Sequence, residues 1–400
     1  MFISSSLYRF VELNKLQKEL LDTPELQRLR YLKQLALVDK IFPDATHTRF
    51  THAIGVSHLA TQFAKALKLS PEETSLIQAA GMLHDVGHPP FCHVTNRFLK
   101  QILGDRGIDE HEELSRQIIE GKFVMNLPGA GQIPSILEKY GIDPKSVGAL
   151  VTNTYKEKPY LQAIISGGVD ADKLDYLKRD SESTGVVSGN VDQHRILQLS
   201  LLNNTHLEFD PKAISPVKEM LQARSTMYNE VYIHRTSHLA SRMLQKALQL
   251  SFDLGENKDF YNLGDEELMM RLMNSENKMA RDLALRIKYR RLYKVAFQLR
   301  MITTQEIEEL VGKLKEMGEE RIEEMLQQRL NLQPGEVLAA FPKVQNISFQ
   351  KLFELRKIRI FDMEGKNTNY SYFNIYCARE NVDRVNQEIK TFLERMKTFE

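Results

Sequence analysis

The chain has 400 residues, of which 42% are hydrophobic and 27% are charged, an ordinary balance for a globular protein of one large or two smaller domains. Its formal net charge of +1 argues against a protein that coats nucleic acid, although a local basic pocket stays compatible with it. Two cysteines make no disulfide framework and suit a reducing compartment. The sequence shows neither a secretory signal pattern nor an apolar run of about 20 residues. We therefore expect a cytoplasmic protein without a membrane span.

Helical periodicity dominates the first half of the chain. Thr23-Pro24-Glu25 is typical of a helix start, and leucines at helical spacing predict a helix over residues 25–35. Further helices are expected over residues 52–69 and 71–85, and helical patterns continue to about residue 179.

The second half is mixed. Residues 201–210 alternate loosely and suit a hairpin, and helices are expected over 214–254 and then to about 332. After Pro334-Gly335 the composition becomes rich in Ile, Phe and Tyr, which favours strands. The elements expected there are strands over 344–349, 357–363 and 370–378 and a helix over 382–396. We predict a mainly α fold, with a catalytic helical domain over residues 1–330 and a small α+β appendage over 331–400.

One stretch concentrates residues that carry chemistry. Met82-Leu83-His84-Asp85-Val86-Gly87-His88-Pro89-Pro90-Phe91-Cys92-His93 holds three of the chain's 11 histidines. An apolar helix rarely carries an adjacent His-Asp pair, because burying it costs free energy unless the pair is bonded or binds a metal. His52 and a carboxylate from the acid-rich segment 169–180 can complete such a ligand set. These residues together favour a divalent-metal site over the alternative for the pair alone, a hydrogen-bonded helix end.

The order of these residues resembles a known family. His52, then His84-Asp85, then Asp172 is similar to the H…HD…D signature of the HD-domain metal phosphohydrolases. Four segments, covering 27–35, 49–52, 84–93 and 170–176, resemble the deoxynucleoside triphosphate (dNTP) triphosphohydrolases, which include bacterial dGTPase-like enzymes and the vertebrate SAM-and-HD-domain dNTPase. The match covers about residues 10–250. It implies an HD-domain helical bundle that hydrolyses a dNTP to the deoxynucleoside and inorganic triphosphate.

The resemblance assigns the metal ligands and the acid–base residues. It implies a divalent ion bound by His52, His84, Asp85 and Asp172. The sequence does not identify the metal, which can be Mn, Mg, Fe, Ni or Zn. It also implies that three histidines contact the phosphates or act as acid–base catalysts, namely His88, His93 and His111. An imidazole is suited to both roles, because its pKa lies near neutral pH. Glu112 would orient its histidine partner. His93 is the expected proton donor to the leaving 5′ oxygen.

One residue departs from the family pattern. Relatives usually place an acid three residues after the last histidine of this stretch, where this chain has Asn96. An asparagine can hold a histidine by a hydrogen bond but supplies no negative charge. Glu112 is the residue that can compensate.

The resemblance also implies substrate contacts. The matching positions are Gln34, Leu35 and Asp180 around the ribose and its 3′-hydroxyl, Arg49 and Lys173 at the phosphates, Tyr176 against the 2′ carbon, and Arg224, Tyr228, Tyr232 and His234 near the γ-phosphate and base. The alternative for this last group is an ordinary interhelical contact. Asp22, Gln27 and Arg30 match positions that read an activating guanine nucleotide in some relatives, and their alternative role is to cap and bridge helices.

Two other functions stay open at this point. Another HD phosphohydrolase would cut a different nucleotide or single-stranded nucleic acid, although the near-zero net charge does not indicate a nucleic-acid partner. A non-catalytic nucleotide sensor is suggested by Asn96, and the intact ligand set argues against it. The resemblance further implies a homo-oligomer.

Overall fold

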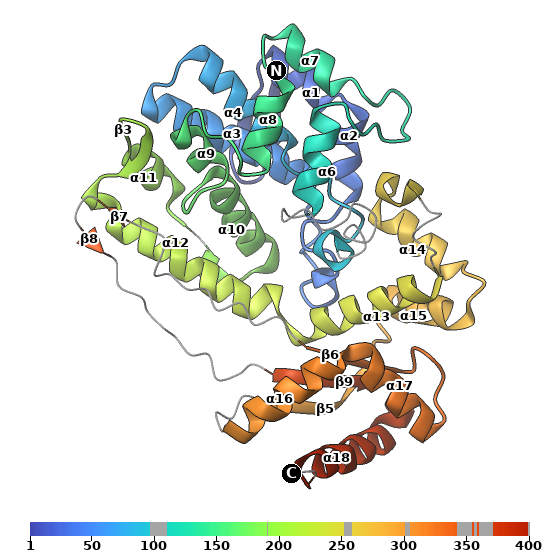
Figure 1. Cartoon of the computed structure of the whole chain (residues 1–400). Helices are drawn as coiled ribbons and strands as arrows, with labels where there is room; N and C mark the ends of the chain where they lie inside the picture. The colour runs from blue at the N-terminus through green and yellow to red at the C-terminus, as the bar shows by residue number, and fades with distance from the viewer. Residues whose placement is uncertain are drawn as a thin grey trace. The chain divides into compact units, whose positions relative to one another are not determined.

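A computed structural model describes residues 1–96, 110–189, 191–251, 258–300, 305–341, 354–355, 358–359 and 371–398. The fold is mainly helical with small sheets (Figure 1), so the predicted fold class is confirmed. The chain forms two compact units. The first contains Met1–Tyr232 and Leu254–Leu268 with Phe349–Asp362, and the second contains Ile233–Asp253 and Met269–Ser348 with Met363–Glu400. The domain boundary expected from the sequence, between residues 330 and 331, stays a prediction.

The first unit opens with a hairpin that the sequence did not indicate. Strands β1 (Phe2–Ser5) and β2 (Arg9–Glu12) pair antiparallel. Helix α1 (Lys15–Leu21) then starts with a capping box, in which the Asn14 and Gln17 side chains each bond the other's backbone N–H.

The helix predicted over residues 25–35 is wrong beyond Arg28. Helix α2 (Pro24–Arg28) begins at the proline as expected, and one 3-10 turn, Leu29–Tyr31, follows it. Leu32 is extended, and its carbonyl accepts a hydrogen bond from the Arg49 N–H at 2.9 Å. Backbone bonds to a distant segment therefore replace the helical bonds that leucine spacing predicted.

Helices α3 (Arg49–Leu67) and α4 (Pro71–Leu83) form the centre of this unit. A capping box of Ser70 and Glu73 starts α4. The two helices approach closely, because a Cβ on Gly81 would lie 3.2 Å from the backbone nitrogen of Ser57. The other helices of the unit include α6 (Glu110–Ile119), α7 (Ile133–Lys139), α8 (Pro144–Val151), α9 (Pro159–Ile165), α10 (Ala171–Thr184) and α11 (Gln193–Gln198) (Figure 1).

The predicted hairpin over 201–210 is confirmed as β3 (Ser200–Asn203) and β4 (His206–Phe209). The helix predicted over 214–254 is interrupted. It consists of α12 (Ile214–Met227), a π-helical turn over Tyr228–Tyr232, and α13 (Arg235–Ser251) in the second unit. A π turn shifts the helical register, and such turns are frequent at functional sites.

The second unit contains a three-stranded antiparallel sheet in the order β5-β9-β6. Its elements are β5 (Lys294–Arg300), β6 (Val337–Ala340), β9 (Ser371–Cys377), α15 (Lys278–Lys288), α16 (Gln305–Met317), α17 (Glu319–Leu330) and α18 (Val382–Thr398). Both faces of β9 are buried, with Phe373 and Ile375 on one side and Tyr376 on the other, which suits its central position. The prediction of continuous helix to about residue 332 is wrong at residues 294–300, which form strand β5.

The C-terminal predictions are confirmed where they can be compared. The strand over 370–378 and the helix over 382–396 correspond to β9 and α18. The predicted strand over 357–363 includes β8 (Ile358–Arg359), which pairs with β7 (Glu354–Leu355), and its remaining residues, like the strand over 344–349, lie outside the described residues. Among the described helices, none is long and apolar enough to cross a membrane.

Candidate metal centre

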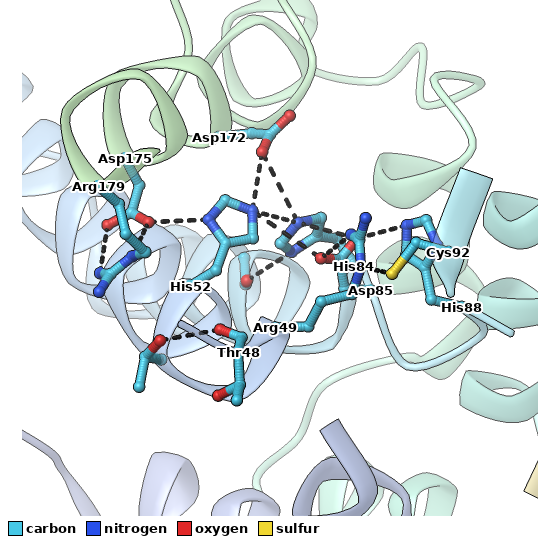
Figure 2. Close-up of polar contacts among 12 residues, drawn as sticks. Thr48, Arg49, His52, His84, Asp85, His88, Cys92, Asp172, Asp175 and Arg179 are labelled. Carbon is cyan, nitrogen blue, oxygen red and sulfur yellow. Dashed lines mark hydrogen bonds and ion pairs between the residues drawn. The ribbon is translucent and has the colours of Figure 1, made fainter. Parts of the chain in front are cut away.

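The four predicted metal ligands converge from three helices. His52 lies in the first turn of α3, His84 and Asp85 follow α4, and Asp172 lies in the first turn of α10 (Figure 2). The His52 Nε2 atom lies 3.0 Å from Asp172 Oδ1 and 3.3 Å from His84 Nε2. The His84 Nε2 atom lies 3.3 Å from Asp85 Oδ1 and 3.8 Å from Asp172 Oδ1. The fold thus brings all four side chains to one point.

The hydrogen bonds of the two rings fix which nitrogen faces that point. His52 Nδ1 lies 2.8 Å from the Asp175 carboxylate, and His84 Nδ1 lies 2.9 Å from the carbonyl oxygen of Gly81. Both partners are acceptors, so both Nδ1 atoms carry hydrogen, and the Nε2 atoms of neutral rings present lone pairs. Two lone pairs and two carboxylates facing one point need a cation. The residues therefore fit a divalent ion bound by histidine and carboxylate ligands.

Electrostatics at this centre favour positive charge. Burial alone would raise the pKa of Asp85, but Arg49 and the neighbouring histidines lower it well below its usual range. Burial alone would lower the pKa of His52, but its hydrogen bonds to Asp172 and Asp175 raise that pKa to about 10. Without an ion the site therefore attracts a proton, which a divalent cation would have to displace.

Arg49 is built into the centre and is not only a surface cation. Its side chain is buried, and its guanidinium donates to Asp85 Oδ2 at 2.6 Å and to Cys92 Sγ at 2.7 Å. The Cys92 thiol in turn lies 3.3 Å from the carbonyl oxygen of Lys33. The residue predicted to contact phosphate thus also orients the predicted metal ligand Asp85 and connects it to the loop after α4.

A second layer of residues orients His52. Asp175, one turn after Asp172 on α10, is fully buried and accepts two bonds of 2.8 Å from Arg179 besides its contact with His52. The role of Asp175 was not predicted, although its spacing from Asp172 places both on one helix face. Gly55 leaves the space for this group, because a Cβ there would lie 1.9 Å from Asp175 Oδ1.

Gly55→Ala is expected to destabilise the protein by about 1–3 kcal/mol, the usual cost of overpacking, and to weaken metal binding. The added methyl must displace the Asp175–Arg179 pair. Gly312→Ala is the matched control, since Gly312 is also helical and a Cβ there meets no atom within 4 Å. Thermal unfolding and Mn(II) titration of both variants measure the effect. Equal behaviour of the two would contradict the assigned role of Gly55.

The three other predicted histidines form a group, which we call the histidine cluster (His88, His93 and His111). The rings of His88 and His111 stack with centroids 3.8 Å apart, and the His93 ring lies edge-on to both, at 5.2 and 5.5 Å. His88 Nε2 lies 3.2 Å from Asp85 Oδ1, so the cluster adjoins the predicted metal ligands. Burial, with the charge of Arg49, lowers the pKa of His88 well below its usual range, which keeps that ring neutral.

Several predicted substrate residues also lie together. Asp180 accepts a hydrogen bond from the Tyr232 hydroxyl at 2.7 Å, and the Tyr232 ring lies 6.3 Å from the rings of Tyr176 and Tyr228. The π turn carries Tyr228 and Tyr232, so the helix irregularity serves this group. His234 belongs to the second unit. The sequence did not indicate His47, whose Nε2 lies 2.7 Å from Asp180.

The remaining predicted residues have the following places. Lys173 donates to Asp170 at 2.6 Å, and Arg224 is close enough to interact electrostatically with Lys173. The Gln34 N–H donates to the His47 carbonyl at 2.9 Å, beside Leu35. Glu112 follows His111 on α6, and Asn96 lies two residues after the 3-10 turn Cys92–Val94 that carries His93.

The proposed activator positions make local contacts. Arg30 donates to Gln27 at 2.8 Å, Gln27 donates to the Leu21 carbonyl at 2.7 Å, and Asp22 caps α1. These contacts agree with the alternative role of the three residues, which is to cap and bridge helices. An activator role stays a prediction.

One buried carboxylate outside the predicted set supports the loop after α4. Asp265 accepts from the backbone N–H of Phe91 at 2.6 Å and of Lys33 at 2.9 Å. Burial raises its pKa to about 6. No local pattern could identify it, since Phe91 is 174 residues away in the sequence.

Comparison with known proteins agrees with this geometry. The model of the HD domain matches residues 49–179, and the model of the HD associated region matches residues 191–398. The first range contains the four converging ligands, and the second extends over more than half of the chain.

Three similar proteins illustrate the relationship. An uncharacterized protein of Methanocaldococcus jannaschii is 32% identical over 73% of this chain and 58% of its own length. The deoxynucleoside triphosphate triphosphohydrolase SAMHD1 homolog of Dictyostelium discoideum is 30% identical over 76% of this chain and 61% of its own length. A phosphohydrolase of Bacteroides thetaiotaomicron, known from its crystal structure, is 26% identical with a TM-score of 0.66, covering 85% of this chain and 87% of that one.

The chain spans about three fifths of the length of the two curated relatives. The matched models nevertheless account for nearly all of the chain from Arg49 onward. The resemblance found in the sequence is thus confirmed, and the chain belongs to the HD-domain family, as a member that carries the HD-associated region and resembles the triphosphohydrolase branch.

Proposed function

We propose that the protein is a metal-dependent phosphohydrolase that cleaves a dNTP to the deoxynucleoside and inorganic triphosphate. The observation that carries this proposal is the convergence of two imidazole lone pairs and two carboxylates beside the histidine cluster. The SAMHD1 homolog, by its name a dNTP triphosphohydrolase, supports the choice of substrate.

His52, His84, Asp85 and Asp172 would hold the divalent ion. The ion supplies positive charge that polarises a phosphoryl group and makes an attacking water more acidic. Arg49 and Lys173 add fixed positive charge for the phosphates. Water attacks the α-phosphorus, the bond from phosphorus to the 5′ oxygen breaks, and His93 gives its proton to that oxygen. The products are the deoxynucleoside and triphosphate.

The group of Tyr176, Asp180 and Tyr232 would select the sugar. The Asp180 carboxylate is held by Tyr232 and His47, so it can accept a hydrogen bond from a 3′-hydroxyl in a fixed direction. The Tyr176 side chain would fill the space that a 2′-hydroxyl needs. Rejection of ribonucleotides would then follow from shape.

The test is incubation of each dNTP and each ribonucleoside triphosphate with metal-free protein reloaded with Mn(II) or Mg(II). We expect inorganic triphosphate from the dNTPs, and in ¹⁸O-labelled water we expect the label in triphosphate. Release of pyrophosphate or monophosphate would overturn the proposal. Cleavage of another nucleotide or of single-stranded nucleic acid would favour a different HD phosphohydrolase, and binding without turnover would favour a sensor.

His93→Ala is expected to lower the rate of dNTP hydrolysis about 10²- to 10⁴-fold, the range for loss of a general acid. Its Mn(II) affinity should fall by less than the about 10- to 100-fold that loss of a residue orienting a metal ligand usually costs, because His93 is not among the four converging ligands. His206→Ala, at the exposed first position of strand β4, is the matched control. Unchanged turnover in His93→Ala would assign proton transfer to another group.

The resemblance also implies a homo-oligomer and a nucleotide activator, and the composition predicts a cytoplasmic location. Each stays part of this proposal. Size measurement with and without guanine nucleotide tests the first two together. If guanine nucleotide changes neither the mass of the protein nor its rate of dNTP hydrolysis, the proposed activator role is excluded.

A further inference from the structure

The N-terminal hairpin reaches the metal centre through one side chain. Tyr8 lies in the turn between β1 and β2, and its hydroxyl donates to Asp175 Oδ1 at 2.7 Å, across 167 residues of sequence. The Tyr8 ring packs against the ring of His58 on α3, with centroids 4.7 Å apart. The hydroxyl is therefore held in place from the side of α3.

The Asp175 carboxylate is shared among three side chains. Oδ1 accepts from the Tyr8 hydroxyl and from Arg179, and Oδ2 accepts from Arg179 and from His52 Nδ1. A carboxylate has about four acceptor positions, so these contacts use its capacity and fix its plane. Asp175 is fully buried, so water cannot readily replace a lost donor.

We propose that Tyr8 is a positioning residue of the metal centre, which fixes the plane of Asp175 and thereby aims His52 Nε2 at the metal. This inference rests on the metal site of the proposed function. Without the hydroxyl, Oδ1 keeps only its bond from Arg179, one acceptor position of the buried carboxylate is left without a donor, and the Asp175–Arg179 pair can shift as a unit. His52 then loses the fixed direction of its Nδ1 bond, which is what orients a metal-ligating ring.

The inference assigns a structural role to the N-terminal hairpin. It is separated by more than 160 residues from Asp175, and only Tyr8 among its side chains has a described bond to that carboxylate. The N-terminal strands thus contribute to ligand geometry without supplying a ligand.

The test uses full-length Tyr8→Phe, which keeps the ring against His58. Calorimetric titration of metal-free protein with Mn(II) should show affinity weakened by about 3- to 10-fold, below the 10- to 100-fold usual for a direct outer partner. The absorption spectrum with Co(II) should change, because it reports ligand geometry. Tyr140→Phe is the matched control, since it removes a hydroxyl that donates to Glu19 at 2.8 Å. We expect wild-type affinity and an unchanged spectrum for it.

A double-variant cycle separates this role from a general loss of stability. Asp175→Asn alone should weaken Mn(II) affinity by about 10- to 100-fold, and adding Tyr8→Phe should weaken it no further, because Tyr8 acts through Asp175. Additive losses, or unchanged affinity in Tyr8→Phe, would overturn the inference. If Tyr8→Phe folds poorly, the Mn(II)-induced shift of the melting temperature gives the same comparison.

The outcomes also distinguish this inference from the proposed function. A wild-type protein that binds Mn(II) and releases triphosphate, with Tyr8→Phe indistinguishable from it, overturns only the role of Tyr8. A wild-type protein that binds no divalent ion overturns both. Metal binding with weakened affinity in Tyr8→Phe but no dNTP cleavage supports the role of Tyr8 and removes the proposed substrate.

Discussion

Asp172→Ala should lose Mn(II)-dependent dNTP hydrolysis by at least about 100-fold, more than the usual effect of an outer-sphere partner, and should keep its fold. The carboxylate is the only one of the four proposed ligands contributed by α10, and it lies 3.0 Å from His52 Nε2. Its side chain is 34% exposed, so its removal creates no buried cavity. Metal content, Mn(II) titration and release of triphosphate measure the loss.

Thermal unfolding gives an independent readout of Asp172→Ala. An ion that binds only the folded state stabilises wild type by about 2.7 kcal/mol at 100 times its dissociation constant, and the variant should gain much less at the same concentration. Asp282→Ala, which removes a partly exposed partner of Arg286, is the matched control. Retention of wild-type metal affinity in Asp172→Ala would exclude that residue from the ligand set.

Arg49→Met should destabilise the metal-free protein by about 3–5 kcal/mol, the usual cost of breaking a buried ion pair by removing one partner. Both side chains of the Arg49–Asp85 pair are 4% exposed. The variant leaves the Asp85 carboxylate buried without its main countercharge. Mn(II) should recover part of the loss, because the ion supplies positive charge to the same carboxylate. Chemical denaturation with and without Mn(II) measures both effects.

The effect of Arg49→Met should depend on pH with a definite sign. In wild type the pKa of Asp85 lies below its unfolded value, so its contribution to stability is present above about pH 4 and is lost as the pH falls. Without Arg49 the pKa of Asp85 loses the largest of the charges that oppose burial, so it lies higher than in wild type, and the variant loses stability relative to wild type as the pH rises. The difference in the free energy of unfolding between wild type and Arg49→Met should therefore increase from pH 4 to pH 7.

The matched control for this experiment is Arg286→Met. Its partner Asp282 is partly exposed, and such pairs contribute about 0–1 kcal/mol. An Arg49→Met variant as stable as this control at pH 7 would show that Asp85 does not depend on Arg49.

Local pattern was reliable where short-range bonds decide the structure. The proline and capping signals at Pro24 and Ser70 fall at the starts of α2 and α4, because capping involves residues within one turn. The same reasoning failed at Leu32, where a bond to Arg49 competes with the helix. It also failed at β5, whose partner β9 lies more than 70 residues further along the chain.

The sequence by itself determined the family and the identity of the proposed ligands. An adjacent His-Asp pair in an apolar helix, with His52 before it and Asp172 after it, is a pattern of residue types that chemistry restricts strongly. The histidine cluster was likewise identified as a group, although its distances were not.

Tertiary structure alone decided how those ligands are aimed. The bonds from His52, Tyr8 and Arg179 to Asp175, and from the Phe91 N–H to Asp265, join residues that are distant in sequence or carry no distinguishing local pattern. Residue type determines which atoms can bind a metal, whereas the direction of a ring depends on hydrogen bonds that exist only after the chain has folded.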